Sequence, residues 1–283
     1  MDTVLDLADE YLFDAYHVYP ESWESGYWAR QFLSLFLITI SSGILVYISS
    51  AAFNYYFLFD HRLERHPLFL KNQKWLEITT SLKILPVIGV FTAAMFFVEV
   101  RGYSKLFDGS PQPGSFGLLL NIRDIVGFIF FTDCAIYWIH RAMHHRLLYR
   151  RIHKMHHIWK VPTPFASHAF HPIDGFLQSV PYHIYPFMFP LNKYVYLVLF
   201  FLVNVWTISI HDGDYRVPAI LRPFINGSAH HSDHHLYYNY NYGQYFTLWD
   251  RIGGSFKTPS AFEGKSLVDD ILEKERLKKG HQD

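Results

Sequence analysis

Histidines are concentrated in one region of this chain. Of the 18 histidines, 14 lie between residues 140 and 235. Most of them stand in three short sets, which are His140, His144 and His145; His153, His156 and His157; and His230, His231, His234 and His235. Imidazole binds iron, zinc and copper, and two histidines four residues apart on a helix point from one face. The spacing therefore predicts a metal site, and three sets together could hold two metal ions.

Each set has a structural alternative when it is taken alone. The set at 140–145, HRAMHH, could belong to a polar stripe packed between helices. The set at 153–157, HKMHH, lies among arginines and lysines and could be a basic stretch that is attracted to anionic lipid. The coincidence of three sets in one region favours metal binding over both alternatives.

Four further histidines lie between the sets. His168 and His171, in TPFASHAFHPIDG, could add metal ligands or orient them, or could belong to a turn packed by prolines. His211 opens the polar stretch HDGD and is predicted to be a ligand. His183 lies inside an apolar block, where a buried histidine with no metal is the expectation.

Several polar residues near the sets are candidates for orienting the ligand rings. Asp133 and Tyr137 share a helix face with His140 and His144, because the four follow steps of four, three and four. They would lie deeper than the histidines and could bond to a ring N–H, or they could be polar residues packed between helices. The other candidates for this orienting role are Asp174, Asp212, Asp214 and Asp233.

The elements that carry these residues are predicted to be membrane helices. Half of the residues are hydrophobic and 19% are aromatic, and the apolar residues are gathered in long blocks. Residues 32–59 contain no charged residue, and about 20 apolar residues suffice to span a bilayer. This block is too long and too far from the first residue for a signal peptide. Residues 84–98 form a second apolar block.

The remaining apolar blocks carry the histidine sets. A third block, residues 117–139, is a predicted span although it contains Arg123 and Asp124. Residues 173–190 and 194–210 are separated by Leu-Asn-Lys, which is typical of the tip of a helical hairpin. The expected fold is all-α and multi-pass, with about four spans or hairpin legs and a histidine-rich cap that holds two metal ions.

Charges beside the first block predict its orientation. Residues 1–31 contain seven acidic residues and a single basic one, Arg30, whereas residues 60–75 contain four Lys and Arg residues. Positively charged flanks stay in the cytosol. The N-terminal segment is therefore predicted to be luminal and the histidine cap cytosolic, where the sequon at Asn226 would escape glycosylation.

Composition excludes two features. The chain has 25 basic and 25 acidic residues, so it offers no basic field for nucleic acid. Its single cysteine, Cys134, rules out an intrachain disulfide and is expected to be a packing residue.

Three functions are considered for a histidine-rich site at a membrane surface. A zinc hydrolase is disfavoured, because the chain has no H-E-x-x-H motif and no glutamate beside the sets. A membrane metal transporter is disfavoured because transporters bind their ions near the middle of the spans, and these sets lie at span ends. Oxidation of a lipid fits better, since two metal ions at the interface could activate dioxygen beside a lipid that arrives from the bilayer.

The three sets in this order, followed by YGQYFTLWDRIGGSF, resemble the fatty acid hydroxylase superfamily of membrane di-metal oxidases. RIHKMHHIWKVPTPFASHAFHPIDG, IHDGDYRVP and INGSAHHSDHH are similar to the sterol C5-desaturases of that superfamily, over nearly the whole chain. This resemblance implies oxygen-dependent removal of two hydrogens from C5 and C6 of a Δ7-sterol, from lathosterol to 7-dehydrocholesterol, in the endoplasmic reticulum membrane. A C4-methylsterol oxidase or a lipid hydroxylase is the nearest alternative.

The resemblance also implies cofactors, partners and ligands. The expected metal is iron in a di-iron centre, with zinc as an alternative in purified protein. Electrons would come from NADH or NADPH through cytochrome b5 and its reductase. The family pattern makes eight histidines catalytic metal ligands, with His145 and His230 extending the first and third sets: His140, His144, His153, His156, His157, His231, His234 and His235. Some relatives have a further histidine four positions after the one that matches His211, where this chain has Tyr215, so His168, His171 or water would complete that ligand set.

The expected organisation has four parts. These are a luminal N-terminal segment (1–31), two transmembrane helices with their loops (32–116), a catalytic domain of the fatty acid hydroxylase type (117–260) and a cytosolic tail (261–283). The tail mixes apolar and charged residues in a way that is typical of a short amphipathic helix.

Overall fold

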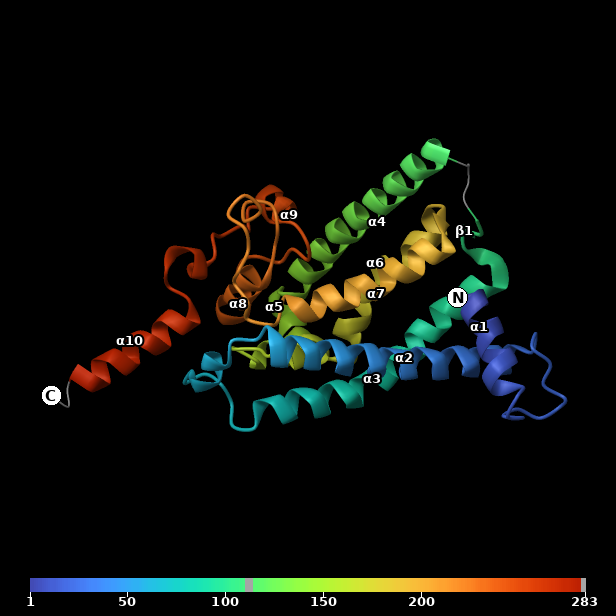
Figure 1. Ribbon diagram of the computed structural model, residues 1–283, viewed down its shortest axis with the longest axis horizontal. Coiled ribbons are helices and arrows are strands. Elements are labelled where there is room, and N and C mark those ends of the chain that lie inside the picture. The colour runs from blue at the N-terminus through green and yellow to red at the C-terminus, as the bar shows by residue number, and fades with distance from the viewer. Residues whose placement is uncertain (110–113, 281–283) are drawn as a thin grey trace.

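The computed structural model describes residues 1–109 and 114–280 (Figure 1). Within them the chain is mostly helical, as the apolar blocks predict. The predicted luminal loop around residues 101–117 lies partly outside the described residues, and so does the end of the predicted tail.

Within the described residues, five long helices build the body of the protein, and short elements connect them. The long helices are α2 (Trp28–Phe57), α3 (Gln73–Val98), α4 (Gly114–Met143), α6 (Pro172–Met188) and α7 (Lys193–Ser209). The shorter α-helices are α1 (Asp2–Ala8), α5 (Arg146–Tyr149), α8 (Ser228–Tyr237), α9 (Leu248–Ile252) and α10 (Leu267–Gly280). The remaining turns of helix are η1 (Asp9–Phe13), η2 (His61–Arg65), η3 (Glu99–Tyr103), η4 (His153–Ile158), η5 (Pro164–His168) and η6 (Ser260–Glu263).

The first two apolar blocks form helices that are long enough to cross a membrane. They are Trp28–Phe57 and Gln73–Tyr103, with mean hydropathies of 2.1 and 2.0. Only 17% and 33% of their most apolar windows are buried inside the protein. Most of these apolar side chains therefore face outward, where they need an apolar surrounding.

The helices α2 and α3 lie side by side along the length of the molecule (Figure 1). They approach closely at Gly89, where an added Cβ would lie 2.9 Å from Cγ1 of Ile40. Helix α6 packs against α3, α7 packs against α2, and α4 packs against α6. A core of buried side chains joins the two groups, for instance Leu35 on α2, Phe96 on α3 and Phe128 on α4.

The predicted hairpin tip is confirmed between α6 and α7. Strand β2 (Leu191–Asn192) lies there and pairs in parallel with β1 (Leu106–Phe107). The Asn192 side chain then caps α7 by accepting hydrogen bonds from the backbone N–H groups of Tyr194 (2.9 Å) and Val195 (3.2 Å). The tip is thus tied to the far end of the molecule, and α6 and α7 run from it toward the histidine segments.

The histidine-rich segments gather at the other end of the long helices, around α8 (Figure 1). Two buried carboxylates hold the loop that follows α8. Oδ1 of Asp133, on α4, accepts from the Tyr245 N–H at 2.7 Å, and Asp250 accepts from the N–H groups of Tyr242 and Gly243 at 2.8 Å each. These bonds fix α8 and its loop against α4.

Candidate metal centre

The described part of the chain brings nine histidines together in two clusters. Cluster A consists of His140, His144, His153, His157 and His234. Cluster B consists of His156, His211, His231 and His235. Within each cluster the ligand nitrogens lie within 4.8 Å of one another, which is close enough for one metal ion to bind several of them.

Helical spacing explains how the three sets divide between the clusters. His140 and His144 lie one turn apart on α4 and point into cluster A. In η4, His153 and His157 also enter cluster A, whereas His156 points into cluster B.

The third set divides in the same way. On α8, His231 and His235 are four residues apart and enter cluster B, while His234 enters cluster A. His211, directly after α7, completes cluster B. The segments η4 and α8 therefore each contribute to both clusters and hold them side by side.

Acceptor groups fix the orientation of three rings in cluster A. Nδ1 of His140 lies 2.9 Å from the carbonyl oxygen of Tyr242, and Nδ1 of His234 lies 2.8 Å from that of Tyr240. Nδ1 of His153 lies 2.7 Å from Oδ2 of Asp174. A carbonyl accepts only, as an ionised carboxylate does, so these Nδ1 atoms carry the proton and the Nε2 atoms keep their lone pairs.

Two rings of cluster B are fixed by backbone carbonyls alone. Nδ1 of His211 donates to the Thr207 carbonyl at 2.7 Å, and Nδ1 of His235 donates to the Trp159 carbonyl at 2.9 Å. Their Nε2 atoms also face the cluster with a free lone pair.

The Nε2 atoms meet at distances that suit a shared metal ion. Those of His140 and His153 lie 3.1 Å apart, and neither carries a proton that could form a hydrogen bond. Nε2 of His234 is buried and has no partner within residues 1–109 and 114–280. Facing lone pairs repel, and a metal ion among them turns that repulsion into coordination. The donor set of both clusters therefore fits metal ions.

Burial favours the neutral form of several cluster histidines. It lowers the pKa values of His156, His157, His231 and His235 well below 6.5, and neighbouring imidazoles lower them further. Neutral rings present the lone pair that a metal requires. A site made of imidazole alone suits iron, zinc or copper, and not magnesium or calcium.

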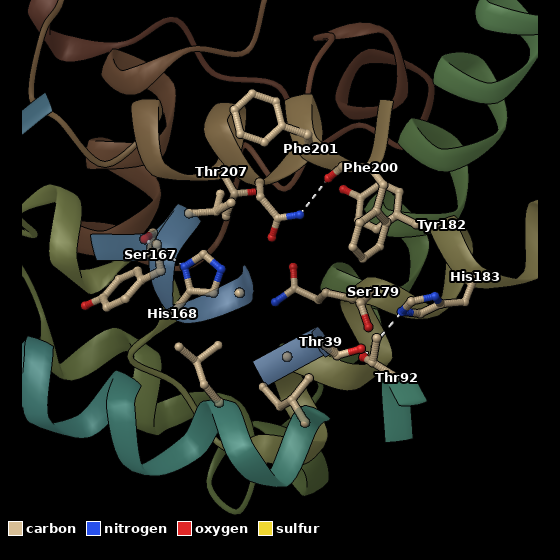
Figure 2. Close-up of a pocket in the computed structure, with 18 of the residues that line it drawn as sticks. Thr39, Thr92, Ser167, His168, Ser179, Tyr182, His183, Phe200, Phe201 and Thr207 are labelled. Atoms are coloured by element: carbon tan, nitrogen blue, oxygen red, sulfur yellow. Dashed lines mark hydrogen bonds between the residues drawn. The ribbon is translucent and has the colours of Figure 1, made fainter. Parts of the chain in front are cut away.

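A cavity of about 400 Å³ ends at the clusters. The helices α2, α3, α6 and α7 provide most of its walls, which are largely apolar. Figure 2 shows His168 and His183 on opposite sides of the cavity, with Phe200 and Phe201 of α7 along another wall. Its inner end is formed by His140 of cluster A and three histidines of cluster B, which are His156, His211 and His231. A long apolar molecule in this cavity would thus lie against cluster B.

Comparison with known proteins assigns the chain to a family. A profile of the fatty acid hydroxylase family matches residues 125–255, which include both clusters. Human lathosterol oxidase is 60% identical over 273 residues, which cover 96% of this chain and 91% of that protein. The chain belongs to the lathosterol oxidase family. The mouse lathosterol oxidase is 61% identical, with 97% of this chain and 92% of the mouse protein covered.

The family extends to fungi. A Delta(7)-sterol 5(6)-desaturase of Aspergillus fumigatus is 53% identical over 82% of this chain and 68% of the fungal protein. No solved structure matches the chain. Membership of the lathosterol oxidase family confirms the resemblance that the histidine sets carry.

Asp174 was predicted to orient a histidine ring, and its carboxylate does contact a ring of cluster A. The carboxylate is fully buried and binds His153, and its other oxygen accepts from Nε2 of Gln178 at 2.7 Å. Gln178 was not among the residues expected from the sequence. Its position four residues after Asp174, on the same helix face, was the available signal.

The other predicted orienting groups make different contacts. Asp133 binds the Tyr245 N–H, and the Tyr137 hydroxyl is 2.8 Å from the Ser255 hydroxyl. Asp212 accepts from the Asp214 N–H, Asp214 pairs with Arg216, and Asp233 accepts from Ser260. The prediction that these residues orient histidine rings is corrected accordingly: they hold the loops around the clusters. The physical reason is that backbone carbonyls, which a sequence does not reveal, occupy the Nδ1 positions of His140, His211, His234 and His235.

Four predicted ligands lie outside both clusters. His145 and His171 are N-caps, with Nδ1 accepting from the N–H groups of Leu147 (3.5 Å) and Ile173 (3.2 Å). Nδ1 of His168 is 3.0 Å from the Ser167 hydroxyl, and this ring lines the cavity. His230 is buried against Phe256 and Phe262, on the side of α8 away from the clusters. His183 is buried as expected, against Phe96 and Phe200.

Proposed function

We propose that this chain is a sterol C5-desaturase, which introduces the C5=C6 double bond into a Δ7-sterol and so converts lathosterol to 7-dehydrocholesterol. The observation that carries this proposal is the apolar cavity that ends on the histidine clusters of a lathosterol oxidase family member. The enzyme is an oxidoreductase, and O2 is the oxidant.

We propose that clusters A and B hold one iron ion each. A di-iron centre, when bound, supplies the oxidising power that removes hydrogen from an unactivated C–H bond. The five histidines of cluster A and the four of cluster B would be its ligands. Hydrogen bonds from Nδ1 to fixed acceptors hold the rings in place, so that coordination requires little rearrangement. The imidazole-only donor set supports iron, with zinc as its substitute in purified protein.

The chain's own residues position the sterol and exclude water. His140, His156, His211 and His231 form the end of the cavity at which the reacting edge of the sterol would lie. The aromatic walls bury the rest of a rigid apolar molecule, and Phe200 and Phe201 cover it from α7. Keeping water away from the reacting carbon protects the oxidation from side reactions.

The family and the flanking charges support a proposal for the location and the partners. We propose an endoplasmic reticulum membrane protein in which α2, α3, α4 and the α6–α7 hairpin provide the spans or hairpin legs. Residues 1–31 would be luminal, and the histidine cap and the tail cytosolic. In the cytosol the cap is accessible to cytochrome b5, which with its reductase would deliver electrons from NADH or NADPH.

The test is sterol profiling by mass spectrometry in cells that lack their own C5-desaturase. Wild type and His156→Ala would be expressed at equal level. We expect 7-dehydrocholesterol with wild type only. Unchanged lathosterol with both proteins would contradict the proposal and direct the search to C4-methyl sterols, other lipids and metal transport. A hydroxysterol as the only product would make the protein a hydroxylase.

A further inference from the structure

A polar side chain of the cavity is linked to a cluster histidine through a buried carboxylate. Gln178 of α6 lines the cavity, and its Nε2 donates to Oδ1 of Asp174 at 2.7 Å. The other oxygen of Asp174 lies 2.7 Å from Nδ1 of His153, which belongs to cluster A. A chain of two hydrogen bonds thus joins the cavity wall to a histidine of the cluster.

The carboxylate fixes which way the Gln178 amide points. An ionised carboxylate only accepts hydrogen bonds, so the amide nitrogen faces Asp174 and the carbonyl Oε1 faces away from it. Within residues 1–109 and 114–280 the hydrogen bond of the Gln178 amide is the one from Nε2 to Asp174, and Oε1 accepts none. Because the side chain lines the cavity, this oxygen is a fixed acceptor available to a ligand there.

The chemistry of a Δ7-sterol places its hydroxyl near the reacting bond. The hydroxyl at C3 is the polar group of the molecule, and C3 is separated from C5 by a single carbon. When C5 and C6 lie at the histidine end of the cavity, the hydroxyl must lie near that end too. A buried hydroxyl with no partner would cost binding energy, so a hydrogen-bond acceptor is needed close to the clusters.

We infer that Gln178 binds the 3-hydroxyl of the sterol through Oε1 and thereby sets which edge of the sterol faces cluster B. This inference rests on the proposed function. Asp174 holds both Gln178 and His153, so the hydroxyl and the metal centre share one rigid support on α6. The hydrocarbon tail of the sterol then extends away from the clusters, along Phe96 and Phe200.

Two other polar groups in the cavity, Asn204 and the His183–Thr92 pair, fit the hydroxyl less well. Asn204 of α7 also lines the cavity, but its amide is held by the Phe200 carbonyl (2.7 Å), and that carbonyl has no bond to a cluster histidine. His183 and Thr92 lie 3.5 Å apart beside Phe96, in contact with the apolar core and not with Asp174. Gln178, by contrast, is held by a carboxylate that also binds a cluster histidine.

The experiment compares two substrates that differ only in the hydroxyl. Microsomes with the full chain would receive lathosterol or its 3-deoxy analogue, cholest-7-ene, and the diene products would be quantified to give kcat/KM. The variants are Gln178→Met, which keeps the length but removes the acceptor, and Asn204→Leu. Ser179→Ala is the matched control, because Ser179 also lines the cavity but its hydroxyl donates to the Phe176 carbonyl at 2.8 Å.

We expect wild type and Ser179→Ala to prefer lathosterol and Gln178→Met to lower that preference about tenfold, mainly through KM for lathosterol. If Gln178 acted only structurally, through Asp174, the substitution would lower kcat/KM for both substrates by the same factor. An unchanged preference in Gln178→Met at equal metal content would overturn the inference, and so would a loss of preference confined to Asn204→Leu. Wild type that makes no 7-dehydrocholesterol would instead contradict the proposed function.

Discussion

Clusters A and B contain the same kind of ligand but differ in number and surroundings. Cluster A has five histidines, and one of them is held by the carboxylate of Asp174. Cluster B has four, and its fixed rings are held by backbone carbonyls. Three of the four histidines of cluster B line the cavity, whereas one histidine of cluster A, His140, does so.

The two clusters therefore have different requirements. Cluster B faces the cavity, so its ligands must leave space for the substrate and for oxygen. Cluster A lies behind it with one more histidine and a charged orienting group, which is typical of a site whose metal is held more firmly. The comparison predicts that cluster B tolerates the loss of a ligand less well than cluster A.

The largest effect is expected from removing one ligand of each cluster. His235→Ala would leave cluster B with three histidines, and we expect one of two iron equivalents to be lost and activity to fall more than about 100-fold. His144→Ala would leave cluster A with four, and we expect both equivalents to be retained. Metal analysis of the purified variants, beside sterol product assays, measures this. Equal metal loss in the two variants would break the comparison.

The next effect concerns the orienting carboxylate. Asp174→Asn removes the negative charge behind His153, and we expect a loss of about 10- to 100-fold in metal affinity or activity. Asp233→Asn is the matched control, because Asp233 is also buried on a histidine segment but binds Ser260. Metal titration should show weaker binding at one site in Asp174→Asn only. Equal weakening in the two variants would mean that buried charge in general, and not ring orientation, supports the centre.

The sequence predicted the helices and the metal site better than the details around them. The long apolar block with Arg123 and Asp124 does form one helix, α4, in which these two side chains pair with each other at 2.6 Å. The division of HKMHH between the clusters was not predictable, because η4 is an irregular turn whose ring directions depend on packing.

Most groups that orient the rings were also beyond sequence analysis. The carbonyls of Thr207, Trp159, Tyr240 and Tyr242 belong to the backbone, so no residue type marks them. Among these orienting groups, Asp174 acts through its side chain, so its role could be predicted from the sequence. Asp133 was expected to serve a ring because it shares a helix face with His140, but its carboxylate lies near the backbone of Tyr245 and binds that instead.

A moderate loss of activity is expected from filling the cavity at Gly43. Gly43 of α2 lines the cavity, and a Cβ added there would meet no atom within 4 Å. Gly43→Leu should therefore fold, keep its metal and lose about 10- to 100-fold in kcat/KM for lathosterol, because the sterol loses space. Leu45→Phe adds volume on the exposed side of the same helix and should be neutral. Normal sterol turnover by Gly43→Leu would place the substrate elsewhere.

The smallest effect tests the histidines that lie outside the clusters. His171 caps α6, the helix that carries Asp174, by accepting from the Ile173 N–H. His171→Ala should lower the free energy of unfolding by about 1 kcal/mol through the lost cap, with both metal equivalents retained. Asn is a good N-cap residue but has no imidazole, so His171→Asn should restore the stability. Thermal unfolding and metal analysis of the two variants separate the roles. Metal loss in both variants would return His171 to the ligand set, and cluster B would then match cluster A in number.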